Sequence, residues 1–188
     1  MVRIGTTVVG VLAALATAAL ANPTGIQCTA DKVYDDVVGI HQNHVSRLDA
    51  AVNGLGTSPD QVTDMQIQDL ENATEGLQKA MSNLDGDVEC TPSVSTDDAK
   101  KIFGELKNTN PLLLDALHGI ATKNTVFTGK YAFVRKMLPA ALSNFEKAYS
   151  TSANGLLAKC SDPGVKRDGQ EMVLGVIAAF KAAEQAYN

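Results

Sequence analysis

Residues 58–88, SPDQVTDMQIQDLENATEGLQKAMSNLDGDV, indicate a long amphipathic helix. Apolar residues recur within this stretch in steps of three and four, which is the spacing of one face of an α-helix. The positions on that face are Ile67, Leu70, Thr74, Leu77, Met81, Leu84 and Val88. Ser58 is a typical helix cap and Pro59 a typical first helical residue, so we expect the helix to begin there and to end near Gly86.

The same spacing predicts helices on both sides of this stretch. The preceding helix covers about residues 31–55. Its expected inward residues are Tyr34, Val38, His41, Val45, Leu48, Val52 and Leu55. The following helix begins at Ser95 or Thr96 and meets Pro111. That proline predicts either one kinked helix or two short helices, with Asn110 as the cap of the second.

Two more helices complete the predicted fold. One covers about residues 128–159 and should bend at Pro139. The other begins at Ser161 or Asp162, with Pro163 as its first helical residue. No sustained alternating run predicts a strand, and the connections are short. We therefore expect an all-α fold, an up-and-down bundle of about five helices.

Small residues stand on several of the expected inward faces. They are Ala121, Ala141, Ala148, Ala178, Ala179 and Ala183. Small side chains allow helices to pack closely, and they also leave an elongated apolar cavity where helices diverge. The two prolines inside helices favour such divergence. We therefore hold two expectations: close helix packing, or an internal apolar cavity along the bundle axis.

The amino-terminal residues predict a secretory signal peptide. Arg3 precedes an uncharged apolar run at residues 8–19, and Ala-Leu-Ala at residues 19–21 is a typical cleavage sequence. We expect a signal peptide at residues 1–21 and one helical domain at residues 22–188. A retained signal anchor is the alternative. The polar carboxyl-terminal residues differ from a glycolipid-anchor signal, so we expect a secreted protein without a transmembrane anchor.

Charge and cysteine content limit the partners. The formal net charge is −5, which disfavours a nucleic-acid partner because phosphate binding relies on clustered basic residues. Cys28, Cys90 and Cys160 lie at one end of the expected bundle, and an oxidising compartment predicts one disulfide and one remaining cysteine. Cys90 is a slightly favoured partner, and the pairing stays open. No spacing of Cys and His residues predicts a metal site.

Catalytic groups are sparse, and we expect neither enzymatic activity nor a cofactor. No nucleophile motif, zinc-protease motif or phosphate-binding glycine loop is present in the sequence. His41 lies on an apolar face, where it either forms a structural hydrogen bond or contacts a ligand head group. Asn72 opens an Asn-Ala-Thr sequon on the outward face of its helix, which predicts N-glycosylation.

Three segments resemble the fungal hydrophobic surface-binding protein A family, which includes cell-wall galactomannoproteins. They are LLDAL at residues 113–117 with the following residues to Phe127, LDAAVN at 48–53, and the closing residues 178–187. The resemblance implies a five-helix bundle whose cavity takes fatty acids, in a secreted or wall-associated protein. Three cysteines and the lack of a Ser/Thr-rich tail depart from the family pattern and favour free secretion.

The expected function is therefore binding of a fatty acid or another hydrophobic ligand. The residues expected to line the cavity are Val45, Leu48, Leu106, Leu113, Val134, Leu138, Leu142, Phe145, Ile177 and Phe180. His41, or otherwise Tyr131, is expected to bind the carboxylate. The alternatives are a protein that adsorbs to hydrophobic surfaces and recruits a secreted hydrolase, and a structural cell-wall mannoprotein.

Overall fold

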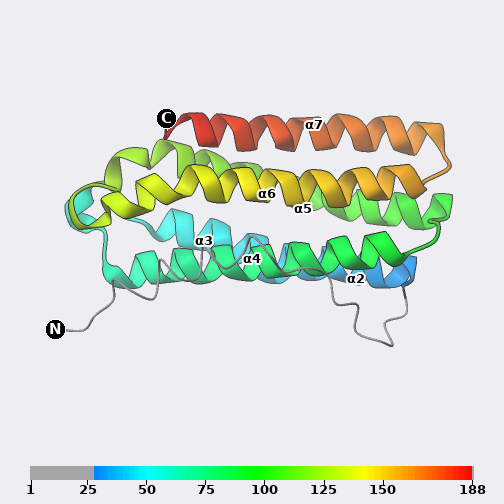
Figure 1. Ribbon diagram of the computed structural model, residues 1–188, viewed down its shortest axis with the longest axis horizontal. Helices are drawn as coiled ribbons and strands as arrows, with labels where there is room; N and C mark the ends of the chain where they lie inside the picture. The colour runs from blue at the N-terminus through cyan, green and yellow to red at the C-terminus, as the bar shows by residue number, and fades with distance from the viewer. Residues whose placement is uncertain (1–27, 188) are drawn as a thin grey trace.

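Five helical rods run back and forth along one axis in the computed structural model, which describes residues 28–187 (Figure 1). The first rod is continuous through three elements, α2 (Ala30–Gly39), η2 (Ile40–Val45) and α3 (Ser46–Gly54). The other rods are α4 (Asp64–Cys90), α5 (Thr96–Thr122), α6 (Ala132–Lys159) and α7 (Pro163–Gln185). Short 3₁₀ helices in the connections are η3 (Pro59–Gln61), η4 (Asn124–Val126) and η5 (Gly129–Tyr131). The all-α fold class is confirmed, and the expected signal peptide lies outside the described residues.

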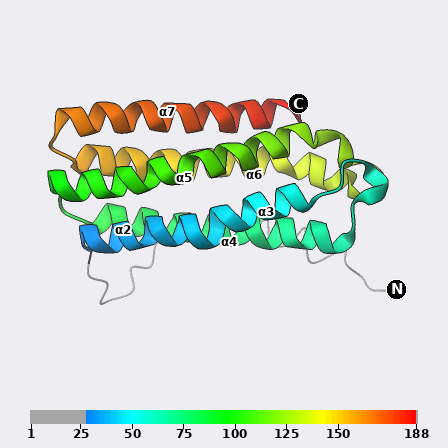
Figure 2. The same cartoon turned by 180° about the vertical axis from the view of Figure 1, so that it is seen from behind.

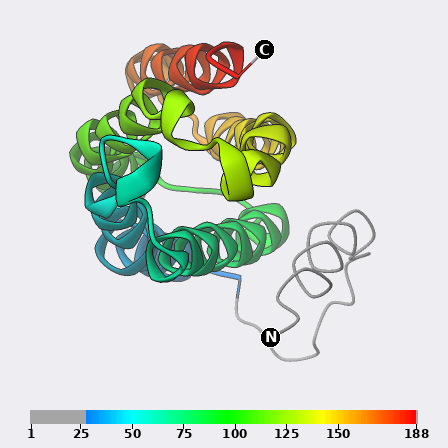
Figure 3. The ribbon, with the colours of Figure 1, turned by 90° about the vertical axis from the view of Figure 1, so that its left-hand side faces the viewer.

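The rods form three layers. α2–α3 and α4 make one outer layer, α5 and α6 lie in the middle, and α7 covers them from the other side (Figures 1 and 2). The end-on view shows the same arrangement, with the rods grouped around a shared axis (Figure 3). No helix among residues 28–187 combines the length and the apolar character needed to cross a membrane. The buried apolar residues of all five rods form one continuous core.

The first rod contains a π-helical segment, and this changes which of its residues face inward. η2 spans Ile40–Val45. A π turn inserts one extra residue into a helix, so residues on its two sides are out of phase with a regular period. Before the π turn the fully buried residues are Val33 and Val37, whereas the predicted Tyr34 and Val38 are only partly buried. The predicted His41, inside the π turn, is also only partly buried.

The start of α4 also differs from the prediction. Ser58 and Pro59 begin the separate 3₁₀ helix η3, and the Ser58 side chain caps nothing. α4 begins at Asp64, where Thr63 accepts from the backbone N–H of Gln66 while the Gln66 side chain accepts from the N–H of Thr63. This reciprocal capping box satisfies two amide groups that a helix start leaves free, which makes it the stronger start signal.

The interior prolines leave both of their helices unbroken. α5 continues through Pro111 and α6 through Pro139, so the alternative of two short helices around Pro111 is wrong. Asn110 consequently caps no helix: it lies in the middle of α5 with a buried side chain. Ser95 caps α5 and Asp162 caps α7, as the sequence predicted.

The disulfide joins Cys28 to Cys90, whose Cα atoms are 5.4 Å apart. It ties the residues before α2 to the last residue of α4. Cys160 is buried, forms no disulfide and lies at the same end of the bundle, where its backbone pairs with that of Val94. The expected single disulfide is thus present.

Close packing of α7 depends on one glycine. A Cβ atom on Gly169 would lie 2.8 Å from Leu157 Cδ2 and 2.9 Å from Phe103 Cε1, both too short for unstrained contact. Gly169→Ala should therefore destabilise the fold by about 1–3 kcal/mol. Gly175 on the same helix has no atom within 4 Å of its Cβ direction, so Gly175→Ala should stabilise it by up to about 1 kcal/mol. Urea denaturation of the two variants tests this, and equal changes would contradict the packing argument.

Candidate functional site

Two adjacent cavities lie inside the bundle. The volume open to the centres of water-sized spheres is about 40 Å³ in the first cavity and about 20 Å³ in the second. All five rods contribute to their walls, and the wall atoms are almost entirely apolar. A volume of this size holds a few water molecules at most. These are therefore narrow gaps along the core.

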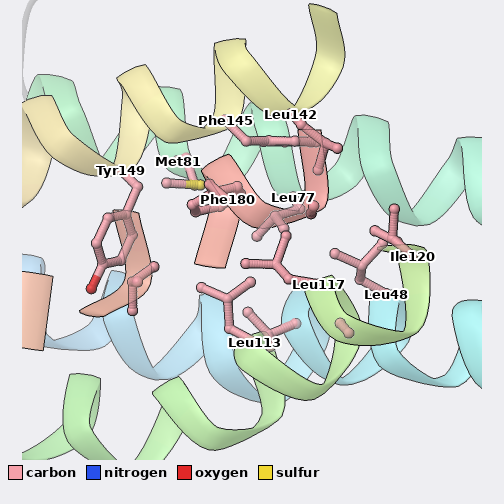
Figure 4. Close-up of a cluster of buried hydrophobic side chains, with 14 of the residues drawn as sticks. Leu48, Leu77, Met81, Leu113, Leu117, Ile120, Leu142, Phe145, Tyr149 and Phe180 are labelled. Carbon is pink, nitrogen blue, oxygen red and sulfur yellow. The ribbon is translucent and has the colours of Figure 1, made fainter. Parts of the chain in front are cut away.

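Three side chains line both cavities and so separate one from the other: Leu77 of α4, Leu113 of α5 and Phe180 of α7. In the close-up, Tyr149 lies at one end of the cluster, Leu48 and Ile120 lie at the other end, and Phe180 lies between them (Figure 4).

Most of the apolar residues nominated from the sequence lie on these walls. The eight that do are Val45, Leu48, Leu106, Leu113, Leu138, Leu142, Phe145 and Phe180. The structure places Val134 and Ile177 outside both cavities. Val134 is buried in the first turn of α6, and Ile177 is half-buried because its neighbour Val176 faces the core instead.

Several residues that line the cavities were not predicted from the sequence as ligand-binding residues. α4 contributes Leu70, Leu77, Met81 and Leu84, which the 58–88 pattern had placed on the inward face. Four polar residues also line the first cavity, mainly through their apolar atoms, and we call this group its polar end: Thr109, Asn110, Tyr149 and Ser152. Tyr149 follows the helical spacing of α6, but nothing in the sequence separates the other three polar residues from exposed ones.

Two of these polar groups lack partners. Thr109 donates to the carbonyl oxygen of Glu105 at 2.9 Å, and Ser152 donates to Asp85 Oδ1 at 3.3 Å. By contrast, Asn110 Oδ1 and the hydroxyl of Tyr149 are buried without a hydrogen-bond partner. Burial raises the pKa of Tyr149 to about 12, and the close approach of the Asn110 side chain to the hydroxyl acts in the opposite direction, so the hydroxyl keeps its proton at physiological pH.

The two residues nominated for the ligand carboxylate already have other partners. His41 Nδ1 lies 2.6 Å from Glu105 Oε1, outside both cavities. This pair links the π turn to α5. The Tyr131 hydroxyl donates to Asp64 Oδ1 at 2.8 Å and also lies 3.3 Å from the carbonyl oxygen of Val62. The hydrogen bond from Tyr131, together with Lys130, lowers the pKa of Asp64.

Other predicted features can be located on the described chain. Asn72 is exposed on α4, and its glycosylation stays a prediction. Within residues 28–187, no group of three or more His, Cys, Asp or Glu side chains is arranged to hold a metal ion.

Comparison with known proteins gives structural neighbours only. No family model and no curated protein matches this chain. The crystal structure of AfMP4p in complex with palmitic acid is similar, with a TM-score of 0.74 and 16% sequence identity, covering 85% of this chain and 99% of that one. Ligand-binding domain 1 of the Penicillium marneffei MP1 protein, complexed with arachidonic acids, has a TM-score of 0.72 and 16% identity, with the same coverage. Domain 2 of that protein, complexed with multiple arachidonic acids, has a TM-score of 0.67 and 15% identity, covering 84% of this chain and 92% of that one. This chain therefore shares the helical fold of these ligand-binding domains.

Proposed function

We propose that this chain is a secreted, non-catalytic protein that binds a long-chain fatty acid or a similar single-chain lipid along its bundle axis. The observation that carries the proposal is the pair of adjacent apolar cavities whose walls share Leu77, Leu113 and Phe180. Structural neighbours with this fold hold palmitic or arachidonic acid, which supports the same ligand class here.

Binding requires the core to expand, because the two cavities are far smaller than an acyl chain. Burial of each ligand methylene contributes about 0.8 kcal/mol, which offsets the displacement of core side chains. Met81 lines the first cavity, and its flexible thioether side chain adapts readily to a new neighbour. We infer that Phe180 turns away and the acyl chain occupies both cavities.

Secretion belongs to the same proposal. The Cys28–Cys90 disulfide is typical of an oxidising compartment, and the signal-like residues 1–21 agree with export. Attachment to a cell wall and membership of the hydrophobic surface-binding protein A family are further proposals from the resemblance, and glycosylation at Asn72 is a further proposal from its sequon.

The interior is a better candidate than the surface. The exposed large apolar side chains of the described residues are Met65, Leu114, Phe133 and Leu174, one on each of four helices. Single exposed apolar residues are ordinary in globular proteins, so they give little support to adsorption on hydrophobic surfaces.

Blocking the second cavity tests the proposal. Leu142→Trp and Phe145→Trp each place extra volume in its wall, so each should weaken binding of a fluorescent fatty acid at least about tenfold. Phe133→Trp on the same helix is the matched control, because Phe133 is exposed and lines neither cavity. Circular dichroism should show that all three variants remain helical.

Organic extraction of the purified protein followed by mass spectrometry should also recover bound lipid. Absence of saturable binding to the parent protein would overturn the proposal. Equal affinities in the two blocked variants and the control would show that the ligand lies elsewhere.

A further inference from the structure

The polar end of the first cavity contains two side chains, Tyr149 and Asn110, whose oxygen atoms are buried without a hydrogen bond of good geometry. Tyr149 is 6% exposed and Asn110 is 8% exposed, and both line the cavity. Neither the Tyr149 hydroxyl nor Asn110 Oδ1 forms a hydrogen bond of good geometry, although the two side chains lie close enough for Asn110 to lower the pKa of Tyr149. Leaving buried polar atoms unpaired is costly, and proteins generally avoid it. In the close-up, the Tyr149 hydroxyl points away from Phe180, at the end of the apolar cluster opposite Leu48 (Figure 4).

The residues that line this cavity include no Lys, Arg or His. Several charged groups on the helices around its polar end already have partners. Asp85 of α4 accepts from Ser152, and burial raises its pKa. Glu105 of α5 pairs with His41 of η2. On the α6–α7 side, the ion pair is Lys181 with Glu146, at 3.6 Å.

Other charged groups with a partner or a shifted pKa lie on the first rod and on the end of α4. Lys32 pairs with Asp36 and, at 3.2 Å, with Asp87. Burial raises the pKa of Asp36 to about 6. Burial also lowers the pKa of His44, which favours its uncharged form. None of these side chains lines the cavity, so a carboxylate bound inside it would be buried without a counter-charge.

We propose that Tyr149 and Asn110 bind an uncharged, hydroxyl-bearing head group, which orients the lipid proposed above with its tail toward Leu48 and Ile120. The Tyr149 hydroxyl donates to the head-group oxygen, and Asn110 Oδ1 accepts from the head-group O–H. A protonated carboxylic acid and a primary alcohol both supply this pattern. A carboxylate does not, because it has no hydrogen to donate to Asn110.

The pH dependence of binding distinguishes the two ligand sources. Dodecanoic acid and dodecanol have the same chain length. Titration of protein groups should therefore change the affinity for both ligands in the same way, and only titration of the ligand's own head group should make their pH profiles differ. If only the neutral acid binds, its affinity should fall about tenfold per pH unit above about pH 5, hence about a hundredfold from pH 6 to pH 8. The affinity of the alcohol relative to the acid should rise by the same factor. Parallel pH profiles for acid and alcohol would overturn the proposal.

Substitutions test the two head-group contacts directly. Tyr149→Phe and Asn110→Leu each remove one contact and should weaken dodecanol binding about five- to tenfold. Tyr187→Phe is the matched control, because its hydroxyl donates to the carbonyl oxygen of Ile120 at 2.6 Å and it lines neither cavity. Its affinity for dodecanol should stay unchanged.

The outcomes separate this inference from the proposed function. Failure of the parent protein to bind either ligand would remove the proposed function itself. Binding by the parent with unchanged affinity in both Tyr149→Phe and Asn110→Leu would retain lipid binding and overturn the head-group assignment.

Discussion

Phe180→Ala should lower the free energy of unfolding by about 3–5 kcal/mol and at the same time strengthen binding of a long-chain fatty acid. Phe180 is 2% exposed, lines both cavities and packs against the Tyr149 ring with centroids 6.3 Å apart. Its removal enlarges both cavities, and empty apolar space destabilises a core. An acyl chain fills that space without first displacing the ring.

Urea denaturation with and without fatty acid, together with direct titration, measures both effects. Phe127→Ala is the matched control, because Phe127 is 1% exposed, packs against Tyr187 and lines neither cavity. It should show a similar loss of stability without a gain in affinity. A similar gain in the control, or weaker binding by Phe180→Ala, would show that Phe180 does not separate two parts of one ligand site.

The helical spacing of apolar residues was sufficient to predict the five rods, because burial of one face dominates the energy of a bundle. The stripe on α4 was predicted almost completely: six of its seven positions are buried, and Thr74 is half-buried. Local capping was less predictable. Ser58-Pro59 and Thr63-Gln66 are both plausible helix starts, and the second prevails because it pairs two otherwise free backbone amides.

The candidate site was predictable only in its apolar part. The π turn in the first rod shifts the inward face by one residue and moves His41 to the flank, where it pairs with Glu105. A single inserted residue leaves little trace in a periodicity, so the sequence could not reveal it. Asn110 precedes a proline and therefore resembled a cap, although its position within continuous α5 buries it at the polar end of the cavity.

Removing the disulfide should be the largest change to stability outside the core. Replacing Cys28 and Cys90 together by serine should cost about 4 kcal/mol, because the bond closes a loop with a sequence separation of 62 residues and restricts the unfolded chain. That loop contains α2, η2, α3 and nearly all of α4, a whole outer layer of the bundle. The double substitution also prevents a released thiol from pairing with Cys160.

Urea denaturation under non-reducing conditions measures this cost, with Cys160→Ala as the control. Cys160 is buried and forms no disulfide, so its substitution should cost much less.

Thiol titration of the denatured, unreduced parent protein should find one free thiol per chain, that of Cys160. Three free thiols, or a double variant as stable as the parent, would show that the Cys28–Cys90 bond does not hold this layer. Because Val37 of α2 and Leu77 of α4 line the first cavity, the double variant should also bind fatty acid with altered affinity.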